Sequence, residues 1–279
     1  METKVLTESL KYLPYIVASD NKITDVSYAF TNLTEIEISQ LIGMDTNSLC
    51  DLIRLSSKKG LKNIKDNHSY YIFTKSLQPR EVNIIKRTGL MVGEQMYIFL
   101  EKPNSRLEEK IPCIAQYCSN NIFAYAVLSI PDRIILASNQ KFYNQLNEYQ
   151  VEYKCILGKK IDDILSDFKF SFDLISAFKK IAAGKTVEMK EAVLEHEKKG
   201  IGYGDILAFP VYSQNVVKYC VVNIFDVTDK ILYKKRMDEQ SVIIGEQSEK
   251  LKAITNEFKT QLKMNFEALN IKSGLHDSA

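Results

Sequence analysis

Short runs of apolar, β-branched and aromatic residues, separated by turn-forming residues, fill most of the chain and predict β-strands. They fall into two similar sets, each opening with two closely spaced runs around a polar turn. The turns are Asp20-Asn21-Lys22 in the first set and Pro131-Asp132-Arg133 in the second, which predicts a hairpin at each place. The predicted strands are 14–18, 23–26, 70–73, 80–85 and 95–100, then 125–130, 134–138, 187–194, 204–212 and 219–225.

Short helical segments are predicted between the second and third strands of each set. In the first set, Ala29-Phe30, Leu33 and Ile36 have helical spacing, and residues 39–43 read as a helical turn closed by a glycine. In the second set, residues 139–146 and 172–183 are the helical segments, the latter capped at Gly184. Antiparallel strands with segregated short helices predict an α+β fold of two domains.

The apolar spacing changes near Thr228, where a heptad pattern replaces the strand-like runs. The apolar residues at its a and d positions form a seam that one helix cannot bury alone, so the pattern predicts a coiled coil with a parallel partner helix. After residue 258 the seam shifts to Leu262, Phe266 and Leu269. The residues predicted to form the dimer contact are Met237, Ile244, Leu251, Ile254, Phe258 and Leu262.

A segment with two prolines, mixed charges and little apolar content, 101–112, separates the two sets of strands and predicts a linker. The resulting organisation is a first domain over 1–102, a linker over 103–116, a second domain over 117–229, a signalling and dimerisation helix over 230–270 and a tail over 271–279.

Composition excludes several classes of protein. The net charge of +2 gives no overall electrostatic bias toward nucleic acid. No apolar run approaches the roughly 18 residues of a membrane span, and the N-terminus lacks the apolar core of a secretory signal. The 5 cysteines have no metal-ligand spacing, and reduced thiols of this kind are typical of a cytoplasmic protein. We therefore expect no metal site, no membrane insertion and a cytoplasmic location.

Two passages of the second domain resemble the PAS family of sensor domains. Asn139-x-x-Phe142-x-x-x-Leu146 followed by Gly158-Lys159 is similar to the pattern of PAS helices, and Asp226-Val227-Thr228 is similar to the motif that joins a PAS core to its output helix. The resemblance implies two PAS domains, each a five-stranded antiparallel sheet with short helices over one face. It assigns signal coupling to Asp226 and Thr228. The first domain departs from the pattern, since its last strand ends in Glu101-Lys102-Pro103.

Ile254-Thr255-Asn256-Glu257-Phe258-Lys259-Thr260-Gln261-Leu262 resembles the phospho-acceptor box of sensor histidine kinases. Asn256 stands where that family has the phosphorylated histidine, and an amide nitrogen is not a nucleophile because its lone pair is delocalised into the carbonyl. Gln261 replaces the proline that kinks this helix in the family. The resemblance implies a chain of kinase ancestry with a degenerate acceptor box and no ATP-binding domain, and therefore no catalytic residue. An ordinary exposed asparagine is the alternative interpretation of Asn256.

Haem and flavin are not expected as cofactors. PAS haem sensors place a histidine on the long helix, and residues 172–183 contain none. The flavin photosensors of this fold have a reactive cysteine in a G-x-N-C-R-F-L-Q passage; the nearest counterpart, Asn47-Ser48-Leu49-Cys50-Asp51, lacks the arginine, so Cys50 is predicted to be a buried helix residue. An unknown small ligand in a PAS core stays open, with Tyr125, Tyr143, Phe178 and Tyr212 as lining candidates, although an ordinary packed core explains them equally well.

These features favour a sensory or adaptor protein of two-component signalling that forms a homodimer, or a heterodimer with a histidine kinase, through its C-terminal helix. One alternative is the sensor part of an active kinase whose catalytic half is missing. Another is a regulator that binds a small apolar ligand.

Overall fold

The computed structural model describes residues 12–55, 60–89, 91–103, 106–111, 114–119, 122–146, 153–196 and 200–274. The predicted first domain thus lies partly outside the described residues at 1–11, and the predicted tail does so at 275–279. The chain divides into two compact units, Met1–Asp226 and Val227–Ala279. The first unit contains two antiparallel sheets, one in each half.

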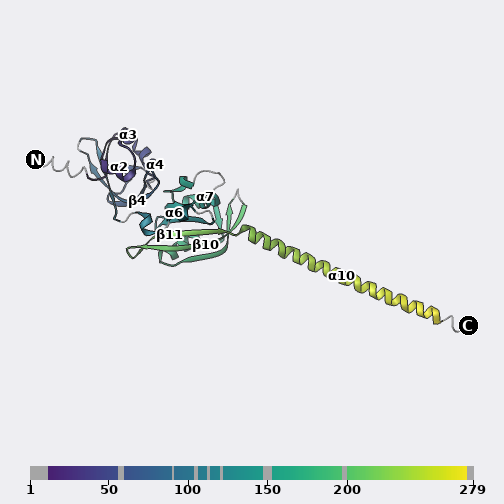
Figure 1. The fold of residues 1–279 in the computed structure, drawn as a ribbon. Coiled ribbons are helices and arrows are strands. Elements are labelled where there is room, and N and C mark those ends of the chain that lie inside the picture. Colours follow the sequence, from purple (N-terminus) through teal and green to yellow (C-terminus); the bar gives the residue numbers. More distant parts are fainter. Residues whose placement is uncertain are drawn as a thin grey trace. The chain divides into compact units, whose positions relative to one another are not determined.

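The first sheet has five strands in the order β2-β1-β5-β4-β3. We call the part of the chain that builds it, residues 12–101, the first subdomain. Short helices follow the opening hairpin, as the apolar spacing predicted (Figure 1). The elements are β1 (Tyr15–Ser19), β2 (Lys22–Val26), α2 (Tyr28–Thr34), α3 (Ile38–Leu41), α4 (Thr46–Leu52), η1 (Leu61–Asn63), β3 (His68–Phe73), β4 (Pro79–Thr88) and β5 (Gln95–Glu101).

Local chemistry sets the turns and helix starts of this subdomain. Asp20 and Asn21 have φ of 51° and 66°, the left-handed values that a tight hairpin needs and that these residue types tolerate. Ser27 caps α2: its Oγ accepts from the Phe30 amide at 3.1 Å and from the Tyr15 amide at 2.8 Å. The second of these bonds ties the helix start to β1. Phe30 then packs into the core against Phe99, with ring centroids 4.9 Å apart.

The predicted linker contains one short helix, α5 (Leu107–Lys110), and the start of a second, α6 (Ile114–Ser119), which continues into the predicted second domain. Its apolar residues Leu107, Ile111 and Ile114 are buried in the hydrophobic cluster of the second sheet. The prolines and charges indicated an open connection, but these three side chains anchor the segment to a core. The described part of the linker is therefore packed structure.

The second sheet has six strands in the order β7-β6-β11-β10-β9-β8, one more than predicted. We call residues 122–226 the second subdomain. The extra strand is β8, which pairs with the end of β9. Its elements are β6 (Ala124–Ser129), β7 (Ile135–Ser138), α7 (Gln140–Leu146), η2 (Tyr153–Ile156), α8 (Ile161–Ile164), η3 (Leu165–Asp167), β8 (Phe168–Phe170), α9 (Leu174–Ala182), β9 (Val187–His196), β10 (Gly200–Ser213) and β11 (Val216–Asp226).

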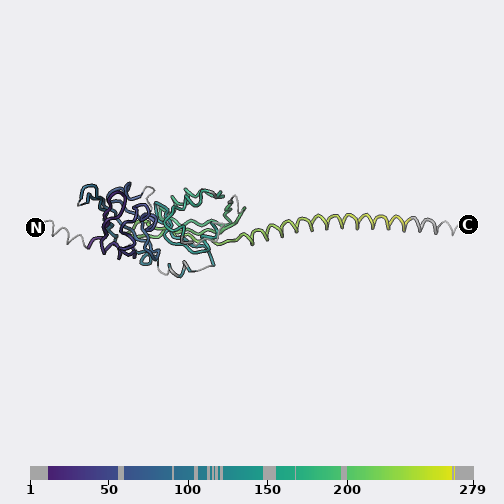
Figure 2. Tube along the Cα trace, turned by 90° about the horizontal axis from the view of Figure 1, so that it is seen from above, coloured from purple at the N-terminus to yellow at the C-terminus, as the bar shows by residue number. Residues whose placement is uncertain are grey.

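The second unit is a single helix, α10 (Thr228–Gly274), and Figure 2 shows it as one uninterrupted coil. It begins two residues before the predicted start at 230, directly after the end of β11. Although α10 is long, neither it nor any other helix in the described residues has a stretch apolar enough to cross a bilayer.

Candidate functional site

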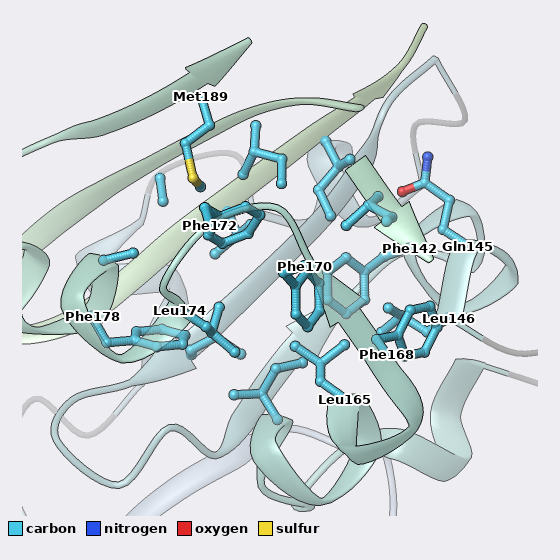
Figure 3. A pocket seen from close by; sticks show the side chains of 18 of the residues that line it. Phe142, Gln145, Leu146, Leu165, Phe168, Phe170, Phe172, Leu174, Phe178 and Met189 are labelled. Carbon is cyan, nitrogen blue, oxygen red and sulfur yellow. The ribbon is translucent and has the colours of Figure 1, made fainter. Parts of the chain in front are cut away.

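A cavity of about 80 Å³ lies inside the second subdomain between its sheet and its helices (Figure 3). Among the described residues, Gln145 is the single polar one in its lining. All others are apolar: Leu128, Phe142, Leu146, Ile161, Leu165, Phe168, Phe170, Phe172, Leu174, Ala177, Phe178, Ile181, Met189, Leu194, Ile206, Ala208, Val222 and Ile224.

The sheet supplies one wall of the cavity through strand alternation. Successive side chains of a strand point to opposite faces, so Ile206 and Ala208 of β10 share a face, as do Val222 and Ile224 of β11. The pairing register places Ile206 beside Ile224 and Ala208 beside Val222. Leu128 of β6 completes this wall.

Helix α7 supplies a second wall, and a buried asparagine fixes where it starts. Asn139 is fully buried, and its Oδ1 accepts from the amides of Tyr125 at 3.0 Å and Phe142 at 2.9 Å. Its Nδ2 donates to the Phe123 carbonyl at 2.7 Å. The cap therefore ties α7 to β6, and Phe142 and Leu146, one helical turn apart, both reach the cavity.

Aromatic residues of β8 and the segment after it form the third wall. Phe168 and Phe170 flank Lys169 on β8 and therefore extend to the same side, and Phe172, two residues beyond the strand, also lines the cavity. The rings of Phe170 and Phe172 lie 5.2 Å apart at 52°. Figure 3 shows this row of rings facing the space between α7 and α9.

Helix α9 closes the cavity. Asp173 Oδ1 accepts from the amides of Ile175 and Ser176 and so starts the helix there, which is later than the predicted start at 172. Phe178 lines the cavity on one side, and the Arg133 guanidinium lies 5.5 Å from its ring centroid. Arg133 in turn pairs with Asp162 at 2.8 Å. Phe178 is thereby held between the cavity and a charged pair.

The chemistry of this lining suits an apolar occupant. Because no charged side chain of the described residues contributes to it, the cavity offers a water molecule few of the hydrogen bonds it would need. At about 80 Å³ it holds only a few heavy atoms without rearrangement of the core. Leaving such a space unfilled costs roughly 24 cal/mol per Å³, about 2 kcal/mol in total, which is the free energy that a fitting ligand can recover.

Of the four predicted lining residues, only Phe178 borders the cavity. Tyr125 is buried, but it is three residues before Leu128 on β6 and so faces the opposite side of the sheet. Tyr143 is buried on α7, where burial and a hydrogen bond with Cys155 raise its pKa. Tyr212 is 54% exposed on β10, and its hydroxyl donates to the Gly184 carbonyl at 3.4 Å.

The residues missed at this site are chiefly Phe168 and Phe170, which together with Phe172 form an aromatic wall. The alternation Phe168-Lys169-Phe170-Ser171-Phe172 is a strand signal in the sequence. The prediction assigned Phe172 to a helix and gave the preceding residues no strand.

The predicted signal-coupling residues lie at the junction of strand and helix: Asp226 ends β11, and Thr228 begins α10. Asn256 lies in the middle of α10 and is exposed, with its carbonyl accepting from Thr260 Oγ1 at 2.9 Å. The six predicted seam residues are also exposed in this single chain, Ile244 at 65% and Leu251 at 64%, for example.

Cys50 and His68 both lie in the first subdomain. Cys50 is a buried residue of α4, as predicted, and burial raises the pKa of its thiol to about 11. His68 is exposed at the start of β3 beside Tyr70. In the part of the chain that the structure describes, no three acidic, histidine or cysteine side chains gather as metal ligands would.

No family model and no curated protein matches this chain. Among solved structures, the PAS domain of nitrogen regulation protein NR(II) from Vibrio parahaemolyticus is similar over 42% of this chain and 98% of its own, with 12% identity and a TM-score of 0.33. A sensory box sensor histidine kinase from Vibrio cholerae is similar over 38% and 82%, with 16% identity and a TM-score of 0.29. An RNA-binding light-oxygen-voltage receptor is similar over 83% and 98%, with 11% identity and a TM-score of 0.35. Similarities at this level do not assign the chain to a family.

Proposed function

We propose that this chain is a cytosolic sensory or adaptor protein built from two PAS-type subdomains, which dimerises through α10 and biases a partner histidine kinase. The observation that carries the proposal is the junction at Asp226-Val227-Thr228, where the last strand of a sheet with an apolar cavity leads directly into a helix of 47 residues. A change in the cavity thereby has a covalent route to the helix.

The exposed apolar residues of α10 support pairing with a second helix. Met237, Ile244, Leu251 and Phe258 recur every seven residues, and each is about half exposed or more in the single chain. Burying such a side chain contributes about 1.5–3 kcal/mol, so a seam of this length would supply substantial affinity. The preferred occupant is a second copy or the matching helix of a kinase, because a heptad seam is complementary to another heptad seam.

The test compares two charge substitutions on α10 by native mass spectrometry of the full chain. Leu251→Asp places a charge in the seam, and we expect the dimer dissociation constant to rise by roughly 10- to 100-fold, because about 1.4 kcal/mol corresponds to each factor of ten. Asn256→Asp adds the same charge five residues after Leu251, at the f position of a heptad in which Leu251 is a and Ile254 is d, and should leave the dimer intact. A monomeric wild type that also binds no kinase helix, or equal effects of the two variants, would refute pairing through this seam.

Two other functions remain distinguishable. If the chain is the sensor part of an active kinase, a longer protein that contains it must label itself with ATP, and at a residue other than Asn256. If it is a ligand-binding regulator, the purified chain must have a stoichiometric adduct in native mass spectra, and filling the cavity must abolish it. The cavity favours this second alternative, since an unfilled apolar space is retained at a cost in stability.

A further inference from the structure

Strand β3 of the first subdomain is buried on both of its faces. Ile72 belongs to the core of the first subdomain, whereas its neighbours Tyr71 and Phe73 belong to the hydrophobic cluster of the second. Tyr71 is 8% exposed and Phe73 is fully buried. Because alternate residues of a strand point to opposite faces, the outer face of the first sheet must be covered by the second subdomain.

In the second subdomain, strand β11 is likewise buried on both of its faces. On β11, Cys220 and Tyr219 point to opposite faces, and both are at most 2% exposed. The Tyr71 and Tyr219 hydroxyls interact with each other, and burial of the pair raises the pKa of both groups. The contact between the subdomains therefore lies on β11, the strand that ends at Asp226.

A buried carboxylate on the neighbouring strand β4 also contacts β11. Glu81 lies opposite Tyr71 in the pairing of β4 with β3, and its side chain is only 9% exposed. Its oxygens lie 3.1 and 3.2 Å from Nζ of Lys218 on β11. Its Oε1 also accepts from Lys102 Nζ at 2.7 Å and from Ser69 Oγ at 2.8 Å.

The balance of these contacts keeps Glu81 ionised. Desolvation alone would raise its pKa, but hydrogen bonds from Lys102, Ser69 and Lys218 together outweigh it and hold the pKa below the ordinary value. A buried charge with only one of its cations left would be poorly compensated, so removing either partner weakens the contact strongly. An ion pair of this kind is a specific link, unlike the exposed pair of Arg87 with Asp66.

A close backbone approach marks a second point of contact. Arg54 Nη1 donates to the Leu157 carbonyl at 3.2 Å. The next residue, Gly158, has φ of 83°, and a Cβ there would lie 3.0 Å from Arg54 Cβ and 3.3 Å from Phe73 Cε2. Both the positive φ and these contacts disfavour a side chain at this point, where the two subdomains meet.

We infer that the first subdomain is a second regulatory input of this chain, which acts on strand β11 through the Glu81–Lys218 ion pair and the Tyr71–Tyr219 contact. Tightening or loosening of the first sheet then changes the stability of the strand from which α10 emerges. This coupling does not depend on what α10 binds or on what occupies the cavity.

The test is hydrogen–deuterium exchange of the full chain, resolved by peptide. In Glu81→Gln we expect the β11 amides of Val216–Asp226 to exchange about 10-fold faster or more, equivalent to about 1.4 kcal/mol of lost local stability. Strand β9, in the same sheet but two strands from β11, should keep its exchange rate. Arg87→Gln, on the same strand as Glu81, is the matched control and should leave β11 unchanged.

Coupling between two sites must be reciprocal, so a change on β11 should also affect the first subdomain. Lys218→Met should speed exchange in β3 and β4, and it keeps the Glu81–Lys102 pair, so it remains informative if Glu81→Gln does not fold. Faster exchange of β3 and β4 in Glu81→Gln with β11 at the wild-type rate would overturn the inference. So would equal acceleration of β9 and β11, since that indicates general loss of stability.

Discussion

The unfilled space in the second subdomain determines whether a larger side chain there stabilises or destabilises the fold. Ala208 of β10 lines it and is 4% exposed. The substitution Ala208→Val adds two methyl groups toward that space. Burying them contributes about 0.8 kcal/mol each, and filling all 80 Å³ would recover no more than about 2 kcal/mol. We expect a net gain of about 1 kcal/mol after partial filling, since valine cannot reach every part of the cavity.

Ala126 of β6 provides the control. Both alanines are cross-strand partners of Val222, Ala208 from β10 and Ala126 from β6, so both lie on the same face of the sheet. Ala126 is fully buried but does not border the cavity. Ala126→Val makes the same chemical change in a filled region, where overpacking costs typically 1–3 kcal/mol. Both variants replace alanine by valine in a strand, so the higher strand preference of valine affects them equally and does not explain a difference between them.

The assay is thermal unfolding of the full chain, followed by a probe experiment with xenon. A gain of about 1 kcal/mol shifts the melting temperature of a chain of this size upward by roughly 2–4 °C. We expect xenon to shift nuclear magnetic resonance signals of Phe142 and Phe178 in the wild type and not in Ala208→Val. Destabilisation of Ala208→Val equal to that of Ala126→Val, together with absent xenon shifts in the wild type, would refute the cavity.

Three further outcomes follow from the structure. Because the folded-state pKa of Glu81 lies below its unfolded value, the stability that it contributes is present above about pH 4.3 and is lost as the pH falls through the folded pKa; Glu81→Gln should flatten this part of the pH profile of unfolding. Asn139→Ala removes a helix cap and leaves buried backbone groups unpaired, so we expect a loss of about 3 kcal/mol in urea unfolding, and a loss under 1 kcal/mol would contradict the assigned role. Gly158→Ala should lower the melting temperature more than Gly43→Ala, because both glycines have positive φ but only Gly158 has neighbours within 4 Å; equal effects would show that the close contact with Arg54 is unimportant.

Much of the fold was predictable from local patterns. Hairpins at Asp20-Asn21 and Pro131-Asp132, the helix starting at Asn139 and the change of period near Thr228 are encoded by neighbouring residues. Turn chemistry, caps and hydrophobic period act over a few residues, so they can be read without knowledge of the rest of the chain. The dimer seam of α10 stays a prediction.

The site was less predictable because it depends on which face of a strand is covered. Tyr125 and Phe178 are both buried aromatic residues and were both expected to line a pocket. Phe178 of α9 borders the cavity, whereas Tyr125 of β6 points to the other face of the sheet. The row of rings from Phe168 to Phe172 gains its role only when β8 pairs with β9.

By itself, the sequence determined the ten predicted strands, the helical segment that begins at Asn139 and the junction at Asp226, because each depends on short-range preferences. The tertiary structure alone decided that the linker helices are packed and that a cavity remains among the phenylalanines. It alone also decided that Glu81 meets Lys218, a contact between residues 137 positions apart. Such pairings arise from packing of whole sheets, and no local pattern specifies them.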